Sequence, residues 1–234
     1  MNLQFMSRTF IACLKGIPTT LIIVSLTILI STPLAILVGI ARYKKIKVLH
    51  QILSVYTSFI RGTPSILQIY LVYNTVPSML AIFLKNIGSE VNVFDLNPII
   101  YALIVFVLNI TATFSEIVRS ALMTVDKGQY EAAQTVGLSR LRTYQRIIFP
   151  QAIVSAIPNI CTLIVGLIKM TSLAFAMTVQ DIMAIAKIEA GNSYNYIEAY
   201  IDVFIIYFVL CILIEAIFKR IEVRTKRFKF QTAT

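Results

Sequence analysis

The stretch GQYEAAQTVGLSRLRTYQRIIFP, Gly128 to Pro150, is the longest polar run in a chain that is otherwise strongly apolar. Asp126, with a glutamine three residues later, forms the pattern of a capping box and predicts the start of a helix. Gly137 is placed to end that helix in a left-handed conformation, and Ser139 is placed to cap a second helix. The stretch is therefore predicted to form two short helices that meet at a glycine corner, outside the apolar part of the protein.

The composition of the chain indicates a membrane protein. Its 234 residues are 58% hydrophobic, with a mean hydropathy of +0.81 and a net charge of +10. Several apolar runs reach the roughly 20 residues that span a bilayer as a helix. The positive charge lies in short loops beside these runs, which favours membrane lipid rather than nucleic acid as the partner. We therefore predict an all-α, multi-pass protein of the cell (plasma or inner) membrane.

Hydropathy divides the chain into an interfacial segment, one transmembrane domain and a basic tail. The predicted segments are 1–16 at the interface, 17–218 as the transmembrane domain with its polar helices at about 126–146, and 219–234 as the tail. The five predicted spans cover 17–41, 48–74, 98–119, 147–167 and 196–218. Between them, 76–97 is predicted to be an outside loop with a short surface helix, and 174–195 a re-entrant or outer-face helix.

The distribution of Lys and Arg predicts the orientation. Fifteen of the 21 basic residues lie after the first span, in the central polar stretch or in the tail. Because basic residues concentrate on the cytoplasmic side, this bias places the N-terminus outside and the C-terminus in the cytoplasm.

A charge, a glycine and a proline interrupt the second predicted span at Arg61-Gly62-Thr63-Pro64. Such residues are costly at membrane depth unless they face protein or water. We interpret the motif as a break within a helix. The alternative is a loop between two apolar pieces that do not each span the membrane.

The chain has few residues of the kinds that enzymes use for catalysis. Cys13, Cys161 and Cys211 are scattered through apolar sequence and have no metal-ligand spacing, and His50 is the sole histidine. No GxxxxGK[ST], GxSxG or HExxH motif is present. We therefore expect a non-enzymatic chain that binds no metal or cofactor of its own. If ATP drives its activity, another subunit must hydrolyse it.

Polar residues inside the apolar segments are candidates for a substrate path. A zwitterionic substrate requires a cation for its carboxylate and an acceptor for its ammonium, and Glu116 with Arg61 and Lys169 could supply these groups. The alternatives are that Glu116 pairs with Arg119, three residues away, and that the neutral polar groups join helices. The predicted path residues are Arg61, Thr63, Asn109, Ser115, Glu116, Lys169, Thr171 and Ser172.

The central stretch resembles the cytoplasmic loop of the permease subunits of ATP-binding-cassette (ABC) importers. That loop has the form E-A-A, three residues, G, nine residues, I, one residue, L-P. Glu131, Ala132, Ala133, Gly137, Ile147 and Pro150 match it, and Phe149 stands where leucine is usual. The resemblance implies a coupling helix that docks on the ATPase, formed here by Gly128, Gln129, Glu131, Ala132, Ala133 and Gly137. The alternatives are an ordinary amphipathic loop, and a purely local bracing role for Glu131.

The order of the RGTP, SEIVR and KMTSL motifs is similar to that in polar-amino-acid permeases of the same class. Met170 stands where an acid is usual, which puts any role of that carboxylate in doubt. The resemblance implies the type I ABC importer permease fold. It also implies a second permease subunit in a homo- or heterodimer, an extracellular solute-binding protein, and two cytoplasmic ATPases that carry ATP and Mg. Cystine is the single best candidate substrate. A stand-alone secondary amino-acid transporter and a membrane-embedded lipid enzyme are the alternatives.

Overall fold

The computed structural model is predominantly helical in the residues that it describes, which are 2–88 and 91–231, with side chains described up to Thr225. Met1 and residues 232–234, at the ends of the predicted N-terminal segment and tail, lie outside this range. The longer helices are α1 (Leu3–Leu14), α2 (Ile17–Tyr43), α3 (Lys47–Gly62), α4 (Ser65–Asn86), α5 (Ile99–Met123), α8 (Phe149–Thr171), α9 (Ile182–Ser193) and α10 (Tyr196–Gln231). The short elements are η1 (Val93–Asp95), α6 (Lys127–Thr135), α7 (Arg140–Thr143), the π-helical turn η2 (Tyr144–Ile148) and η3 (Ser172–Met177).

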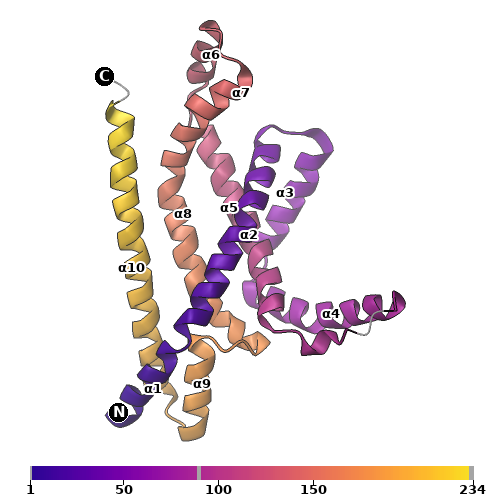
Figure 1. Ribbon diagram of the computed structural model, residues 1–234, viewed down its shortest axis with the longest axis vertical. Helices are drawn as coiled ribbons and strands as arrows, with labels where there is room; N and C mark the ends of the chain where they lie inside the picture. Colours follow the sequence, from indigo (N-terminus) through magenta and orange to yellow (C-terminus); the bar gives the residue numbers. More distant parts are fainter. Residues whose placement is uncertain (1, 89–90, 232–234) are drawn as a thin grey trace.

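The long helices run between two ends of an elongated molecule (Figure 1). α6, α7 and the C-terminal end of α10 lie at one end, and α1 and α9 lie at the other (Figure 1). α2 and α3 form an antiparallel pair, and α4 turns away from that pair and lies across the molecule (Figure 1). The polar corner predicted from the sequence therefore projects from one end of the helix bundle.

Five helical segments are long and apolar enough to cross a membrane, which confirms the predicted number. The second of these segments is Ser65–Asn86, however, and not the predicted 48–74. α3 has 16 residues, which make a helix of about 24 Å, whereas the hydrocarbon core is about 30 Å thick. α3 also carries polar residues along its length, so it is too short and too polar to count as a span.

The break at the RGTP motif is confirmed, but the predicted outside loop at 76–97 is wrong for its first half. α3 ends at Gly62, the backbone is extended at Thr63 and Pro64, and α4 continues to Asn86. Residues 78–84 are mostly apolar helix formers, and they carry the helix past Pro77 instead of forming a separate short one. The break therefore joins two helices of different directions.

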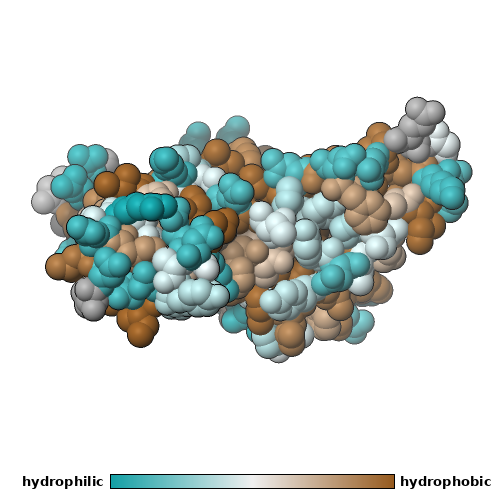
Figure 2. Space-filling model, turned by 90° about the horizontal axis from the view of Figure 1, so that it is seen from below, coloured by the Kyte–Doolittle hydropathy of each residue, from teal (hydrophilic) through white to brown (hydrophobic). Residues whose placement is uncertain are grey.

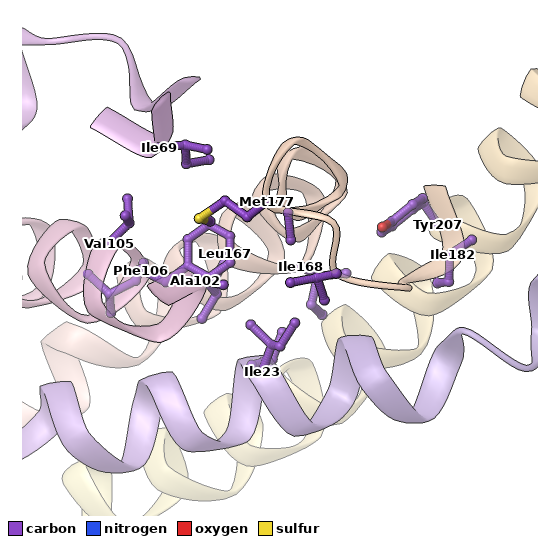
Figure 3. Packing of buried hydrophobic residues seen from close by; sticks show 14 of the residues in the cluster. Ile23, Ile69, Ala102, Val105, Phe106, Leu167, Ile168, Met177, Ile182 and Tyr207 are labelled. Atoms are coloured by element: carbon purple, nitrogen blue, oxygen red, sulfur yellow. The ribbon is translucent and has the colours of Figure 1, made fainter. Parts of the chain in front are cut away.

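The main core lies where α2, α5, α8 and η3 meet. Ile23, Phe106, Leu167, Ile168 and Met177 are all fully or almost fully buried there, and their side chains converge in Figure 3. A smaller apolar cluster, Ala121, Leu122, Ile148, Ala152 and Ala156, lies toward the α6 and α7 end. Outside these cores many large apolar side chains are exposed on the spans, for example Leu29, Leu37 and Phe204, as expected for helices that face lipid.

The N-terminal segment packs on the chain itself. Thr9 and Cys13 of α1 are fully buried, and a Cβ at Gly16 would lie 2.5 Å from the backbone nitrogen of Ile182. α1 therefore rests against α9 and α10. The molecule seen from this end shows hydrophilic side chains interspersed with hydrophobic ones (Figure 2), as expected at a membrane–water boundary.

The last two predicted segments also take helical form. Residues 174–195 form part of η3 and the short helix α9, and α10 continues through the predicted tail to Gln231. Good helix formers such as Lys, Arg and Glu dominate residues 219–227, which explains why the helix does not end at the boundary of the apolar span.

Candidate functional site

The corner between α6 and α7 has the local geometry that the sequence predicts, with two exceptions. Ser139 stands at the N-cap position of α7, but its side chain makes no capping hydrogen bond. Gly137 has φ +77, and Leu138 N–H donates to the Ala133 carbonyl at 3.1 Å, which closes the end of α6. Asp126 caps the start of α6 by accepting from Gly128 N–H at 2.6 Å. The predicted capping box is incomplete, because the side chain of Gln129 instead accepts from Gln151 at 3.5 Å.

Gln134 joins the two short helices across the corner. Its side-chain amide donates to the Leu138 carbonyl at 3.0 Å and to the Thr143 hydroxyl at 3.1 Å. Thr143 is fully buried, and its hydroxyl donates to the Ser139 carbonyl at 3.1 Å. The corner is therefore a defined structure, held by side-chain as well as backbone hydrogen bonds.

The predicted coupling residues fall on different faces of α6. Gly128, Gln129, Glu131, Ala132 and Gly137 are exposed, whereas Ala133 is buried at 3% exposure. Of the two alanines, only Ala132 is accessible to a partner. Ala133 instead lets α6 lie close to its own chain.

Apolar side chains are exposed at the tip of the corner. Val136 is 75% exposed and Leu141 is 67% exposed. Isolated exposed apolar residues are common, but Val136 directly precedes Gly137 and Leu141 lies four residues after it, in the corner of α6 and α7 that projects from one end of the molecule (Figure 1). Glu131 lines a small adjoining pocket of about 220 Å³ with Tyr43, Tyr130 and Tyr144. The corner presents a small, mixed apolar and polar surface that a partner protein can contact.

A second polar site forms at the break between α3 and α4. The Gln68 amide donates to the Thr63 hydroxyl at 2.8 Å and to the Ile60 carbonyl at 2.8 Å. Asn109 of α5 donates to the Gln68 side-chain oxygen at 3.4 Å. Gln68 therefore satisfies backbone groups that the break exposes and connects them to α5. Gln68 was not among the residues predicted from the sequence, although a glutamine four residues after Pro64 is placed to reach back to the break.

Three of the predicted path residues line one pocket of about 460 Å³ between α3, α5 and α8. They are Arg61, Asn109 and Glu116, and the pocket also takes Asn159 and Thr162 from the middle of α8. The pocket combines a guanidinium, a carboxylate, amides and a hydroxyl with an apolar wall, and its volume is in the range of small-ligand sites. Such a set of groups can bind both ends of a zwitterion.

The ion pairs of Glu116 differ from the predicted cluster with Arg61 and Lys169. Glu116 accepts from Arg42 at 2.7 Å and also pairs with Arg119. Arg42 is 12% exposed at its side chain, and its own carbonyl is 3.1 Å from His50 Nδ1. The predicted pairing with Arg119 is confirmed. Arg42 was not among the predicted path residues, although Arg42 and Glu116 both lie near the C-terminal ends of their helices, α2 and α5.

The other predicted path residues lie elsewhere. Ser115 is fully buried and donates to the Ala112 carbonyl at 2.8 Å, and Thr171 is fully buried and donates to the Ile168 carbonyl at 2.7 Å. Lys169 and Ser172 line a different pocket of about 580 Å³, which faces Glu215 on α10. The structure therefore does not bring Lys169 together with Arg61 and Glu116.

A buried carboxylate at the start of α9 was not selected from the sequence. Asp181 is fully buried. It accepts from Ala184 N–H at 2.8 Å and from the Tyr207 hydroxyl at 3.1 Å. Burial raises the pKa of the Asp181 carboxyl above its ordinary value of 3.8, and the hydrogen bonds from Ala184 and Tyr207 oppose that rise. Asp181 therefore caps α9 and joins it to α10.

Across residues 2–88 and 91–231, no group of three or more His, Cys, Asp or Glu side chains is placed to bind a metal ion.

Comparison with known proteins places these features in context. Residues 31–227 match the family model described as binding-protein-dependent transport system inner membrane component. The chain is 34% identical over 211 residues to the L-cystine transport system permease protein TcyL of Bacillus subtilis (strain 168), covering 90% of this chain and 86% of that protein. It is also 34% identical over 214 residues to the L-cystine transport system permease protein TcyB of the same organism, covering 91% and 86%.

The fold also resembles a solved structure. A crystal structure of an amino acid ABC transporter with histidines superimposes with a TM-score of 0.80 at 24% identity, covering 96% of this chain and 99% of that one. At this identity the likeness concerns the fold, and it agrees with the predicted ABC importer permease fold.

Proposed function

The chain belongs to the family of binding-protein-dependent transport system inner membrane components, and on that premise we propose that it is the permease subunit of an ATP-driven amino-acid importer. The observation that carries the proposal is the corner of α6 and α7. It is a hydrogen-bonded projection with a left-handed glycine and exposed Ala132, Val136 and Leu141 at one end of the spans. A carrier that works alone has no evident use for such a projection.

The corner is proposed to transmit movement from a cytoplasmic ABC ATPase dimer, which binds and hydrolyses ATP with Mg. This chain then has no catalytic role of its own. The positive-inside bias supports a cytoplasmic location for the corner and the C-terminus, with the N-terminus outside. A second permease subunit and an extracellular solute-binding protein complete the proposed assembly.

The pocket lined by Arg61, Asn109 and Glu116 is proposed as part of the substrate path. Arg61 is exposed in the pocket and available for a substrate carboxylate. Glu116 has two guanidinium partners, but a carboxylate has about four lone-pair sites and can accept further hydrogen bonds from an ammonium. Thr63 acts here by fixing the break beside Arg61. Ser115 and Thr171 are proposed to support the helices, and Lys169 and Ser172 to contribute from a separate surface.

Transport then follows alternating access. ATP closes the ATPase dimer, the corner moves with it, and the spans change from inward-open to outward-open around the pocket. The binding protein delivers the substrate, and hydrolysis resets the assembly. Cystine is the proposed substrate, because TcyL and TcyB are both cystine permeases by name.

The test uses two glycines with the same backbone strain. Gly137 and Gly88 have φ values of +77 and +75, and an added Cβ meets no atom within 4 Å at either position. A non-glycine residue in this conformation costs about 1–2 kcal/mol, so Gly137→Val and Gly88→Val strain the backbone alike. Only Gly137→Val is expected to reduce ATP-driven uptake and ATPase association, by about tenfold.

Uptake is measured in vesicles with the binding protein outside and the ATPase and ATP inside, using radiolabelled cystine, glutamine, histidine or arginine. Equal effects of the two glycine variants would refute the coupling role of the corner. Uptake by wild type without the ATPase would instead support the stand-alone secondary transporter. ATP-driven uptake of another amino acid in preference to cystine would refute cystine as the substrate and leave the coupling role of the corner unaffected. Arg61→Gln is expected to reduce uptake of the preferred amino acid, with Lys85→Gln as an exposed control outside the pocket.

A further inference from the structure

An apolar groove of about 330 Å³ runs between α2, α5 and α8, in the half of the spans next to the corner. Every residue that lines it is apolar, including Ile36 and Ile40 of α2, Phe114 of α5, and Ile153 of α8. Ile153 is 58% exposed. An exposed groove of this kind within membrane-spanning helices offers a surface that suits a hydrocarbon chain.

The groove adjoins a pocket of about 720 Å³ at the end of the spans. The groove and the pocket share three lining residues, Ile40, Leu122 and Phe149. Two cations also line the pocket, Lys44 at the end of α2 and Arg140 at the start of α7. An apolar groove thus lies beside a site that can bind an anion.

Aromatic side chains connect the two parts. Lys44 Nζ lies 5.5 Å from the ring centroid of Tyr144. The Tyr144 ring lies 6.0 Å from that of Tyr130 and 5.7 Å from that of Phe149, centroid to centroid. The chain has no Trp, so Tyr must supply the aromatic residues that favour the headgroup level of a membrane. The tyrosines of this pocket therefore favour a position at that level.

The acidic residues of the corner line the neighbouring pocket. Asp126 and Glu131 line the adjoining pocket of about 220 Å³. The two pockets have Tyr43, Tyr130 and Tyr144 in common. Among the described residues that line the larger pocket, Lys44 and Arg140 are charged and no carboxylate is present. Its charge therefore favours an anion.

We propose that this groove and pocket bind one anionic phospholipid of the cytoplasmic leaflet, with an acyl chain in the groove and the phosphate between Lys44 and Arg140. Basic pockets between transmembrane helices on the cytoplasmic side are suited to such headgroups. The leaflet assignment rests on the orientation in the proposed function. Because Lys44 ends the first span and Arg140 begins the helix after Gly137, the bound lipid joins a span to the corner and stabilises the position of α7.

The experiment measures lipid binding by the purified permease chain alone, so its result does not depend on transport. Nanodiscs contain phosphatidylglycerol and phosphatidylcholine in equal amounts, and retained lipid is counted by native mass spectrometry. Each cation near an anionic lipid contributes a factor of about five in binding. Lys44→Gln with Arg140→Gln is therefore expected to reduce the preference for phosphatidylglycerol by about 25-fold. Lys47→Gln with Arg142→Gln removes the same net charge outside the pocket and is expected to change the preference by less than twofold.

A photoreactive phenylalanine analogue at Ile153 identifies the occupant of the groove in the same nanodiscs. A cross-link to phospholipid, lost on Ile36→Trp or on the Lys44/Arg140 double substitution, supports the proposal. Equal effects of the two double substitutions, or equal retention of the two lipids by wild type, would overturn it. A cross-link to a second copy of the chain, or to the ATPase when the assembled transporter is used, would also overturn it. Failure of ATP-driven uptake with normal lipid selectivity would count against the proposed function only.

Discussion

The contact between α2 and α5 depends on a glycine that leaves no room for a side chain. A Cβ at Gly39 would lie 2.8 Å from the Ser115 carbonyl oxygen and 2.8 Å from Val118 Cβ. Ordinary contacts of this kind are 3.4–4 Å, so Gly39→Ala requires the helices to separate by roughly 0.6 Å or more. Overpacking of this type costs about 1–3 kcal/mol. Replacing glycine by alanine inside a helix by itself contributes up to about 1 kcal/mol of stability.

Gly166→Ala is the matched control, because Gly166 is inside α8 and a Cβ there meets no atom within 4 Å. Gly166→Ala gains the same helix propensity as Gly39→Ala, and the added methyl group meets no neighbouring helix. The two variants should differ in unfolding free energy by about 1–3 kcal/mol, which corresponds to a difference in Tm of about 2–12 °C for a chain of this size. Gly39→Ala is expected to have the lower Tm.

A thiol-reactive dye measures the transition in detergent, because Cys13 and Cys211 are free and buried and react when the chain unfolds. Equal Tm values for the two variants, or a higher Tm for Gly39→Ala, would refute the close packing of α2 on α5 through Gly39.

Three further perturbations test other parts of the structure. Glu116→Gln leaves the guanidinium of Arg42 without its carboxylate partner and should lower the unfolding free energy by about 2 kcal/mol, less than for a fully buried pair because Glu116 is 24% exposed. Ala132→Arg should preserve Tm and abolish ATPase copurification, whereas Ala133→Arg should lower Tm because that position is buried. Asp181→Asn should remove a pH dependence of the unfolding free energy. Because the pKa of Asp181 is raised on folding, its protonation stabilises the folded state below about pH 4, and this contribution is lost as the pH rises through the raised pKa.

Control variants and pH series separate these effects from general destabilisation. Glu189→Gln removes a pair with Arg8, which is 78% exposed, and should change the unfolding free energy by less than about 1 kcal/mol. If Glu189→Gln lowered the unfolding free energy as much as Glu116→Gln does, burial would not explain the larger contribution expected of the Glu116 ion pairs. Wild type and Asp181→Asn are compared by Tm between pH 4 and 8. Parallel curves would show that Asp181 does not titrate differently on unfolding.

Features that depend on a short stretch of chain were predictable from the sequence. The number of membrane-crossing helices follows from apolar runs of about 20 residues, each of which must satisfy its own backbone in lipid. The corner at Gly137 follows from a backbone conformation that glycine adopts without strain. The break at Thr63 and Pro64 follows from a proline that restricts the residue before it.

Errors arose where the local signal was ambiguous. The predicted loop at 76–97 contains Pro77 and several polar residues that are typical of loops, yet the apolar residues after Pro77 continue α4 to Asn86. The polar helix α3 was counted as part of a span because its apolar residues are numerous, although its length and charge do not suit one.

Hydropathy and backbone conformation are local properties, so the helical membrane architecture, the glycine corner and the break could be predicted from the residues alone. Which polar groups lie together could not be predicted in this way. Glu116 pairs with Arg42, 74 positions away, Lys169 lines a pocket with Glu215 of α10 and not with Arg61, and Ala133 is buried while Ala132 is exposed. These neighbours depend on the rotation and packing of whole helices, which many side-chain contacts determine together.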